Sequence, residues 1–408
     1  MDKHSDFNNN DINNLINSAW DNDEIIKSIL RSKFDERLSE LDISTNQAVE
    51  NLEVPIRTLD GILDGTLKQV DFFSLLKVAQ FLEISFDEIT AHYVQATATK
   101  HKVELELSRK RSFIINNFDL PALKSIGVID SIRDFNHIEQ RIKEIFDLKN
   151  ITDFDIEDTG AAFSSGARLP KNLNSRRYFI SEAKMIFKII NNPNPYDKDA
   201  VAAYFPNIRW HSLDLEEGLI SVIRSLYKVG VTVIFRPKMP KLQMRGATFS
   251  VNNKPCIVLT DYRGLYPTLY FALVHELFHV LFDWEEISKK KYHLSVEGND
   301  PFVIESKERE ANEFARDFMF SKKKMELISE RINERLFVRE TAIDSQVHPS
   351  VIYANYAYDN SSEDDKYFML FRDYFPPFKT LLKKLGAAFE HTSKNKDIAI
   401  FYKTTIFN

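Results

Sequence analysis

The chain has little cysteine: its single thiol, Cys256, cannot form an internal disulfide, and there is no cysteine cluster to hold a structural zinc ion. It also lacks a run of about 18 apolar residues that could span a membrane. The N-terminus is polar and rich in Asn and Asp, rather than a basic segment followed by an apolar one. We therefore expect a protein of the reducing cytoplasm that has no membrane partner.

An excess of positive charge is missing as well. The 408 residues include 54 Lys and Arg against 60 Asp and Glu, which gives a formal net charge of −6. The surface as a whole therefore does not favour nucleic acid. With 43% hydrophobic and 28% charged residues, the chain has the composition of a folded protein and the length for several domains.

The hydrophobic patterns predict an α+β fold that is predominantly helical. Short β-like runs at 231–235, 247–251 and 256–260 suggest a small sheet, and an Asn-Asn-Lys-Pro turn signal separates the last two. The domain division that we expect is a flexible tail (1–28), a small helical bundle (29–98), a helical linker region (99–195), a domain with the small sheet (196–330) and a C-terminal helical region (331–408).

The strongest chemical signal is the segment HELFH. A helix is predicted to begin at Pro267 and to carry His275 and His279 four residues apart, so both imidazoles lie on one face within reach of one metal ion. Glu276 lies about 100° round the helix, where its carboxylate can face a metal-bound water and act as a general base. Two helix-surface histidines are the alternative, but the flanking residues are apolar.

A catalytic zinc ion held by two histidines needs a third protein ligand. A second predicted helix, ESKEREANEFARDF, offers Glu308, with Asn312 one turn later to hydrogen-bond a ligand imidazole. Glu310 is the rival ligand, although it points about 200° away from Glu308. An ordinary charged helix face is the alternative to a metal site. An oxyanion donor is also expected, and His348 and His293 are its candidates.

HELFH followed about thirty residues later by EREANEFA resembles the ImmA/IrrE family of metallopeptidases, over roughly residues 215–325. The resemblance implies a zincin-like domain of the gluzincin type, in which His275, His279 and Glu308 bind Zn²⁺ and Glu276 is the catalytic base. The family usually has Gly before the second histidine, where this chain has Phe278. The implied substrate is a transcriptional regulator, cleaved in the control of stress, prophages, mobile elements or toxin–antitoxin systems.

Residues 36–92 resemble the helix-turn-helix of Cro/repressor-like (XRE-type) regulators. In that resemblance the helix over 55–63 would enter the major groove of DNA, and Arg57, Thr58 and Lys68 would contact it. However, this segment holds 11 acidic and 4 basic side chains, a net charge of −7, which disfavours DNA and favours protein contacts. Such modules are often dimeric, so a homodimer is a further expectation.

Two other features leave alternatives open. The most basic stretch favours a solvated helix face over a patch for nucleic acid or an acidic partner. The run Ala247–Val251 is the candidate for an exposed strand edge along which an extended substrate could pair. The basic stretch consists of Arg168, Lys171, Arg176, Arg177, Lys184 and Lys188.

The intact set of two histidines and two glutamates favours a zinc endopeptidase that cleaves a regulatory protein. The second hypothesis is a DNA-binding regulator or antitoxin-like protein whose metallopeptidase fold senses or scaffolds without cleaving. The third hypothesis is a metal ion that only fixes two helices together. It predicts that metal removal unfolds the protein and that Glu276→Gln has no effect.

Overall fold

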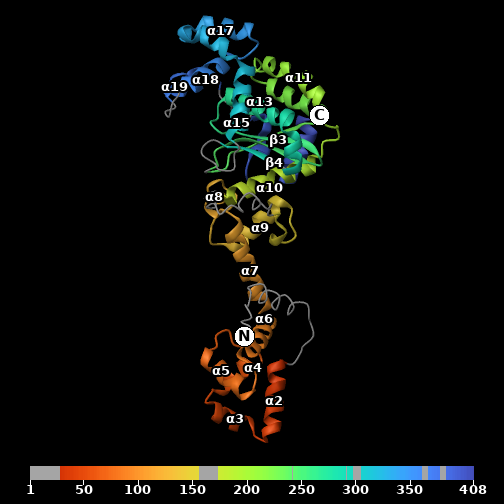
Figure 1. Cartoon of the computed structure of the whole chain (residues 1–408), viewed down its shortest axis with the longest axis vertical. Helices are drawn as coiled ribbons and strands as arrows, with labels where there is room; N and C mark the ends of the chain where they lie inside the picture. Colours follow the sequence, from red (N-terminus) through yellow and green to blue (C-terminus); the bar gives the residue numbers. More distant parts are fainter. Residues whose placement is uncertain are drawn as a thin grey trace, which may run out of the picture. The chain divides into compact units, whose positions relative to one another are not determined.

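The computed structural model describes residues 28–155, 173–240, 242–290, 292–296, 305–360, 366–376 and 383–408. These residues are mostly helical and include one small β-sheet, which confirms the predominantly helical α+β composition (Figure 1). The chain divides into two compact units, an N-terminal unit (Met1–Ser112) and a C-terminal unit (Phe113–Asn408). Within the described residues, none of the helices is both long enough and apolar enough to cross a membrane.

The N-terminal unit is a bundle of short helices closed over one small core. Side-chain caps define where its helices begin: Ser44 and Gln47 form a capping box, and Asp71 and Ser85 cap the helices that follow them. Leu59 and Ile62 are fully buried in the core that the helices share. The helices are α2 (Ile29–Leu41), α3 (Thr45–Leu52), α4 (Ile56–Leu63), α5 (Phe72–Phe81), α6 (Phe86–Lys100) and α7 (Lys102–Asn117), and the division between the units falls within α7.

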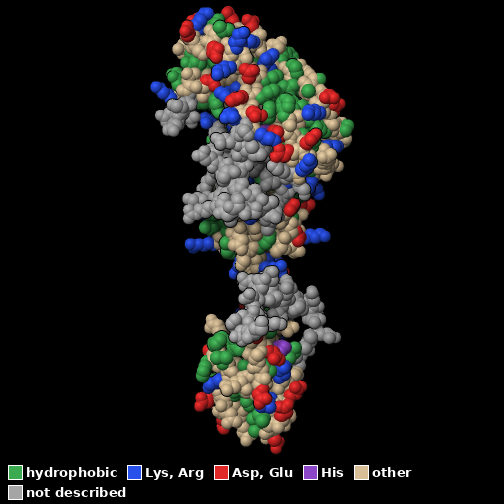
Figure 2. Space-filling view, viewed as in Figure 1, with side chains coloured by type: hydrophobic (Ala, Val, Ile, Leu, Met, Phe, Trp, Pro, Cys, Tyr) green, Lys and Arg blue, Asp and Glu red, His purple; other side chains and the backbone are tan. Residues whose placement is uncertain are grey.

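The surface of the N-terminal unit carries acidic side chains and some exposed aromatic ones. Figure 2 shows acidic side chains at several points on the visible face of this unit. Arg31 is already occupied, since it forms ion pairs with Asp60 and Asp64 of the bundle. Phe72 and Phe73, at the start of α5, are 63% and 67% exposed. This surface therefore combines negative charge with apolar area.

The sheet of the C-terminal unit has the strand order β1-β3-β2-β4. β1 runs parallel to β3, whereas β2 is antiparallel to both β3 and β4. Asn252 and Asn253 have φ angles of 52° and 57° and join β2 to β3, as a two-residue hairpin turn requires. The three predicted strands are confirmed. The strands are β1 (Thr232–Arg236), β2 (Met244–Val251), β3 (Lys254–Thr260) and β4 (Tyr292–Val296).

The position of β2 corrects one prediction. Ala247–Val251 is not an exposed edge, because β4, which was not among the predicted strands, pairs with the side of β2 that β3 leaves open. The edges of the described sheet are β1 and β4. A substrate strand could therefore not pair with β2.

Helices cover both faces of the sheet. Thr248 contacts Glu276 of α13 (Tyr266–Phe282), whereas the ring of the next residue, Phe249, lies 5.8 Å from that of Phe187 in α10 (Leu173–Ile190). Because successive strand residues point to opposite faces, α13 and α10 lie on opposite sides of β2. The same arrangement, with the sheet between α13 and α10, is visible in Figure 1.

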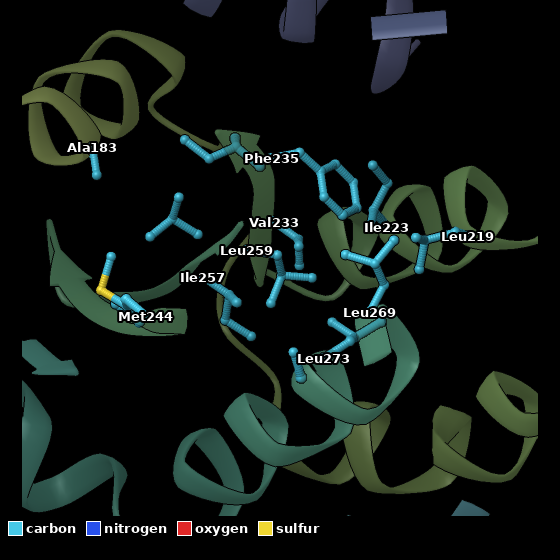
Figure 3. Close-up of a cluster of buried hydrophobic side chains, with 14 of the residues drawn as sticks. Ala183, Leu219, Ile223, Val233, Phe235, Met244, Ile257, Leu259, Leu269 and Leu273 are labelled. Carbon is cyan, nitrogen blue, oxygen red and sulfur yellow. The ribbon is translucent and has the colours of Figure 1, made fainter. Parts of the chain in front are cut away.

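The core of the C-terminal unit is continuous, and its buried residues extend from Ile114 to Ile406. Figure 3 shows Leu269 and Leu273 of α13 packed near the sheet residues Val233 and Leu259. The expected linker, sheet and C-terminal regions thus contribute to one core. The other elements are α8 (Leu120–Ser125), α9 (Phe135–Phe146), η1 (Ile151–Asp153), α11 (Lys198–His211), α12 (Gly218–Lys228), α14 (Trp284–Lys290), α15 (Glu305–Met319), α16 (Lys322–Ile328), η3 (Ser329–Arg331), α17 (Arg335–Asp344), α18 (Pro349–Asn360), α19 (Lys366–Leu370), η4 (Arg372–Tyr374), η5 (Gly386–Phe389), α21 (Asn395–Phe401) and η6 (Tyr402–Ile406).

A buried ion pair connects the sheet to the end of this core. Arg236 of β1 is fully buried and donates to both carboxylate oxygens of Glu182 in α10, at 3.2 and 2.7 Å. It also donates to the backbone carbonyls of Ala388 and Glu390. The hydroxyl of Tyr402 accepts a hydrogen bond from the backbone N–H of Phe235 in the same strand. Residues after 383 therefore help to hold β1 in place, through hydrogen bonds to Phe235 and Arg236.

The basic stretch in α10 is a solvated helix face only in part, since Lys188 is exposed. Arg176 and Lys184 are buried, because α10 packs against both β2 and α21. Arg177 and Lys188 also lie in α10, whereas Arg168 and Lys171 lie outside the described residues. The expectation of a solvated face therefore holds for only part of the stretch, because charge counting alone does not show which side of a helix is covered.

Candidate metal centre

Two packed helices bring together the three predicted ligands. His275 and His279 project from α13, and Glu308 projects from α15, which packs beside it. Glu308 Oε2 lies 3.3 Å from His275 Nε2, and its Oε1 lies 3.2 Å from His279 Nε2. The two Nε2 atoms are 3.3 Å apart. All three side chains are buried, so this group could hold a metal ion.

The spacing of the donor atoms fits a metal ion. A tetrahedral ion with bonds of about 2.0–2.1 Å separates its ligand atoms by roughly 3.3–3.4 Å. The measured separations among His275, His279 and Glu308 are 3.2 to 3.3 Å. Two nitrogen donors and one carboxylate also form a donor set that transition metals accept and that leaves a coordination position for another group.

Asp283 orients one of the ligands, and the sequence analysis missed it. Its carboxylate accepts a hydrogen bond from His279 Nδ1 at 2.8 Å, which leaves Nε2 of this imidazole directed at the other ligands. Burial lowers the pKa of His279, but the hydrogen bonds to Asp283 and Glu308 outweigh it and raise the pKa to about 9. A metal ion must therefore displace a proton from His279 at neutral pH.

Lys307 completes this polar chain. Its ammonium group pairs with Asp283 Oδ1 at 2.8 Å and also with Glu286. Burial raises the pKa of Asp283, but the hydrogen bonds from His279 and Lys307 prevail and lower it to about 2. Asp283 thus stays ionised over the whole neutral range and can hold the His279 ring. For His275 burial is again the largest effect, and here it prevails and lowers the pKa.

Glu276 is fully buried beside the three ligands. The hydroxyl of Thr248 donates to its Oε2 at 2.7 Å, whereas its Oε1 accepts no hydrogen bond from the described residues. Gly246 lies against the same carboxylate, since a Cβ atom there would come within 2.7 Å of Oε1 and 2.9 Å of Cγ. The strand therefore holds one oxygen by a hydrogen bond and packs beside the other, which keeps an unused acceptor position, as a proton acceptor requires.

The residues around the ligands differ in part from the predictions. Asn312 Oδ1 accepts a hydrogen bond from Nη2 of Arg245, at 3.3 Å, and Asp283 rather than Asn312 is the hydrogen-bond partner of a ligand imidazole. Glu310 is exposed, whereas Glu308 is buried. Phe278, in the place where the resembled family has Gly, packs against Phe314 of α15 with ring centroids 5.4 Å apart. A bulky residue is therefore accommodated between the two helices.

The two oxyanion candidates do not join the cluster in the described contacts. His348 precedes α18, where its Nδ1 accepts from the backbone N–H of Ser350 and its own N–H donates to Ser212. This is the role of a helix cap. His293 lies in β4, opposite Thr248, but its side chain is outside the described part of the structure.

The predicted DNA contacts are spread over the N-terminal unit. Arg57 is exposed and Thr58 half-buried, both in the first half of α4. Lys68 follows α4 and forms an ion pair with Glu104 of α7. Its charge is therefore matched within the chain, which removes one of the two cations among the predicted DNA contacts.

Comparisons of the chain with family models, with curated proteins and with solved structures found no match.

Proposed function

We propose that the chain is a zinc-dependent endopeptidase of the ImmA/IrrE type that cleaves a regulatory protein in the cytoplasm. The observation that carries this proposal is the buried carboxylate of Glu276, next to three potential metal ligands and with one oxygen that receives no hydrogen bond from the described residues. A metal that only joined two helices would need no such carboxylate, and burying one is costly. Hydrolysis requires a proton acceptor beside a metal ion that has a coordination position left for water, and Glu276 beside three protein ligands provides this arrangement.

Zinc is the ion that suits this donor set best. Two imidazole nitrogens and one carboxylate are the ligands of many catalytic zinc sites, and carboxylate-rich sites are preferred by magnesium and calcium. A bound zinc ion would supply a Lewis acid for a carbonyl oxygen and acidify a water molecule toward neutral pH. The Asp283–His279 hydrogen bond favours such an ion, because it makes Nε2 a better electron donor.

The proton transfers fall to Glu276. As the water oxygen attacks the carbonyl carbon of the peptide bond, Oε1 of Glu276 accepts the water proton. The same carboxyl group then delivers that proton to the leaving amine as the C–N bond breaks. Thr248 holds Oε2 throughout, so the carboxylate keeps its orientation while Oε1 exchanges the proton.

A protein, rather than DNA, suits the N-terminal unit as a partner. The segment 36–92 has a net charge of −7, and the pairing of Lys68 with Glu104 reduces its cationic surface further. Phe72 and Phe73 are exposed at the start of α5, and exposed aromatic side chains are enriched in protein interfaces. These features support a substrate or partner protein with basic and apolar groups, for which a transcriptional regulator is our candidate, and they give less support to the DNA-binding alternative.

The test combines metal content with cleavage. Wild-type protein, Glu276→Gln and His279→Ala are analysed for bound zinc and incubated with a library of fluorescence-quenched peptides. We expect about one zinc per chain in wild type and Glu276→Gln, reduced zinc in His279→Ala, and cleavage about 10²–10⁴-fold slower in Glu276→Gln. Glu310→Gln, an exposed neighbour in α15, is the matched control and should behave as wild type.

Two outcomes would contradict the proposal. Wild-type protein that takes up no zinc, even after reconstitution, excludes a zinc enzyme. Equal cleavage by wild type and Glu276→Gln, together with unfolding when zinc is chelated, would instead assign the metal a structural role.

A further inference from the structure

His279 is held at both nitrogens of its imidazole. Its Nε2 lies 3.2 Å from Oε1 of Glu308, within the group of metal ligands, and its Nδ1 lies 2.8 Å from Oδ2 of Asp283. The other oxygen of Asp283, Oδ1, lies 2.8 Å from Nζ of Lys307. The Asp283 carboxylate therefore connects the imidazole of a ligand to the ammonium group of a lysine in α15.

Two successive side chains of α15 take part in these contacts, Lys307 and Glu308, both in its first turn. Adjacent side chains project about 100° apart around a helix, so one can face the metal ligands while the other faces the end of α13. Glu308 meets His279 directly, on the Nε2 side, and Lys307 reaches its Nδ1 side through Asp283. The contacts thus form a closed cycle, which fixes the imidazole from both sides.

Lys307 restricts the rotation of the Asp283 carboxylate. The torsion that turns a carboxylate has broad minima, and the side chain of Asp283 is 13% exposed, so water could compete with His279 for it. With Oδ1 bound to Lys307, Oδ2 is left to face Nδ1 of His279. A carboxylate held in this way keeps Nε2 directed at the metal and increases its basicity.

A lysine beside a metal centre also has an opposite effect. Two positive charges repel, so the ammonium group of Lys307 by itself would weaken the binding of a cation. Here, however, the carboxylates of Asp283 and Glu286 lie against this ammonium group, and the lysine side chain is 33% exposed to water. Both features reduce the repulsion. Removal of the lysine should therefore weaken metal binding if positioning dominates, and strengthen it if repulsion does.

We propose that Lys307 is a positioning residue of the metal centre, which acts through Asp283 to direct Nε2 of His279 at the ion. The inference rests on the proposed zinc site and deepens it, because it adds a cation that lies outside the ligand set and yet increases the affinity for zinc. α15 contributes to the centre twice: Glu308 binds the ion, and Lys307 supports the ligand His279.

Three variants of the full chain test this role. Lys307→Met keeps the apolar stem of the side chain and removes the ammonium group, whereas Lys307→Arg restores a cationic donor for Asp283. Lys323→Met, at an exposed lysine of α16, is the matched control, because it changes the net charge by the same amount. Circular dichroism verifies the fold of each variant, and competition with a chromophoric chelator gives its affinity for zinc at fixed pH and ionic strength.

We expect Lys307→Met to bind zinc about 10-fold more weakly than wild type, at the lower end of the loss that follows removal of a group supporting a ligand. Lys307→Arg should recover most of the affinity, and Lys323→Met should match wild type. In a background of Asp283→Asn, Lys307→Met should cause no further loss, since the carboxylate through which it acts is gone. A role in the fold alone would instead add its loss to that of Asp283→Asn.

Three results would overturn the inference: an unchanged or higher affinity in Lys307→Met, a further loss in the double variant, or a Lys307→Met protein that does not fold. The affinities are measured without cleavage, so the proposed function can fail separately. Wild type that binds zinc in this pattern but cleaves no peptide would overturn the peptidase and leave the role of Lys307 in place. Wild type that binds no zinc would overturn both.

Discussion

Two buried charged groups of the C-terminal unit, one around Arg236 and one at the metal centre, are constructed differently. Around Arg236, both oxygens of Glu182 and two backbone carbonyls receive its N–H groups, so the ion pair is closed upon itself. At the metal centre, Glu276 is equally buried, but Thr248 occupies only one of its oxygens and no described residue donates to the other. Buried charges whose hydrogen-bonding positions are all filled stabilise the fold. A buried carboxylate that keeps one acceptor position unfilled can instead accept a proton from a bound molecule.

The largest effect on stability should come from breaking the buried ion pair between Glu182 and Arg236. Glu182→Ala leaves Arg236 buried without its carboxylate, and breaking such a pair costs about 3–5 kcal/mol. Urea unfolding followed by tryptophan fluorescence measures this, since Trp210 and Trp284 lie in the C-terminal unit. Glu334→Ala is the control, because its ion pair with Arg331 is exposed and should matter little. Equal losses in the two variants would show that the buried pair does not hold the unit together.

The next largest effect should be on zinc affinity and should come from Asp283, which orients the ligand His279. Asp283→Asn should weaken zinc binding about 10–100-fold, because the carboxylate no longer fixes the His279 ring or increases its basicity. Competition with a chromophoric chelator gives the affinity. Glu286→Gln also loses contact with Lys307 but not with a ligand, so it should bind zinc as wild type does. An unchanged affinity in Asp283→Asn would contradict the assigned role.

A smaller effect tests the close approach of strand and carboxylate. Gly246→Ala should lower the free energy of unfolding by about 1–3 kcal/mol, because the new methyl group meets the Glu276 carboxylate. In a Glu276→Ala background the same substitution should cost much less, since the obstructing side chain is gone. Chemical denaturation of the four proteins gives the coupling energy. Additive effects would mean that the two residues do not touch in solution.

The smallest effect should come from His348, a half-buried side chain that is neutral in the folded protein. Burial lowers the pKa of His348 to about 4, whereas in the unfolded chain it is near 6.5. The stability that neutral His348 contributes is present above pH 6.5 and is lost as the pH falls toward 4, because the unfolded state takes up the proton first. His348→Asn, which retains an acceptor for Ser350, should therefore lose less stability between pH 7 and 4.5. The same loss as in wild type would assign the acid sensitivity to other groups.

The sequence predicted the ligands because their geometry is local. Four-residue spacing places His275 and His279 on one helix face whatever surrounds the helix. Glu308 followed from the need for a third ligand and from a helix with the right pattern, and the structure brings it to the two histidines. Asp283 was within reach of the same spacing argument, since it lies four residues after His279, but only the folded chain shows that the two meet.

The contacts from the sheet could not be predicted in this way. Thr248 reaches Glu276 across 28 residues of chain, and Gly246 approaches the same carboxylate only because β2 lies under α13. β2 itself became an inner strand through β4, a run of five residues with apolar and polar side chains in alternation that the sequence analysis missed. The pairing of Lys68 with Glu104 likewise depends on tertiary structure.

The ion pair of Arg236 also sets an order of events during translation. When the ribosome has made β1, the carbonyls of Ala388 and Glu390 that Arg236 needs are still 152 and 154 residues away. The N-terminal bundle uses only contacts among early residues, so it can fold while synthesis continues. The nascent C-terminal unit, in contrast, must carry an incompletely covered strand β1 until η5 and the segment after it have emerged, and this interval is when exposed apolar surface favours aggregation.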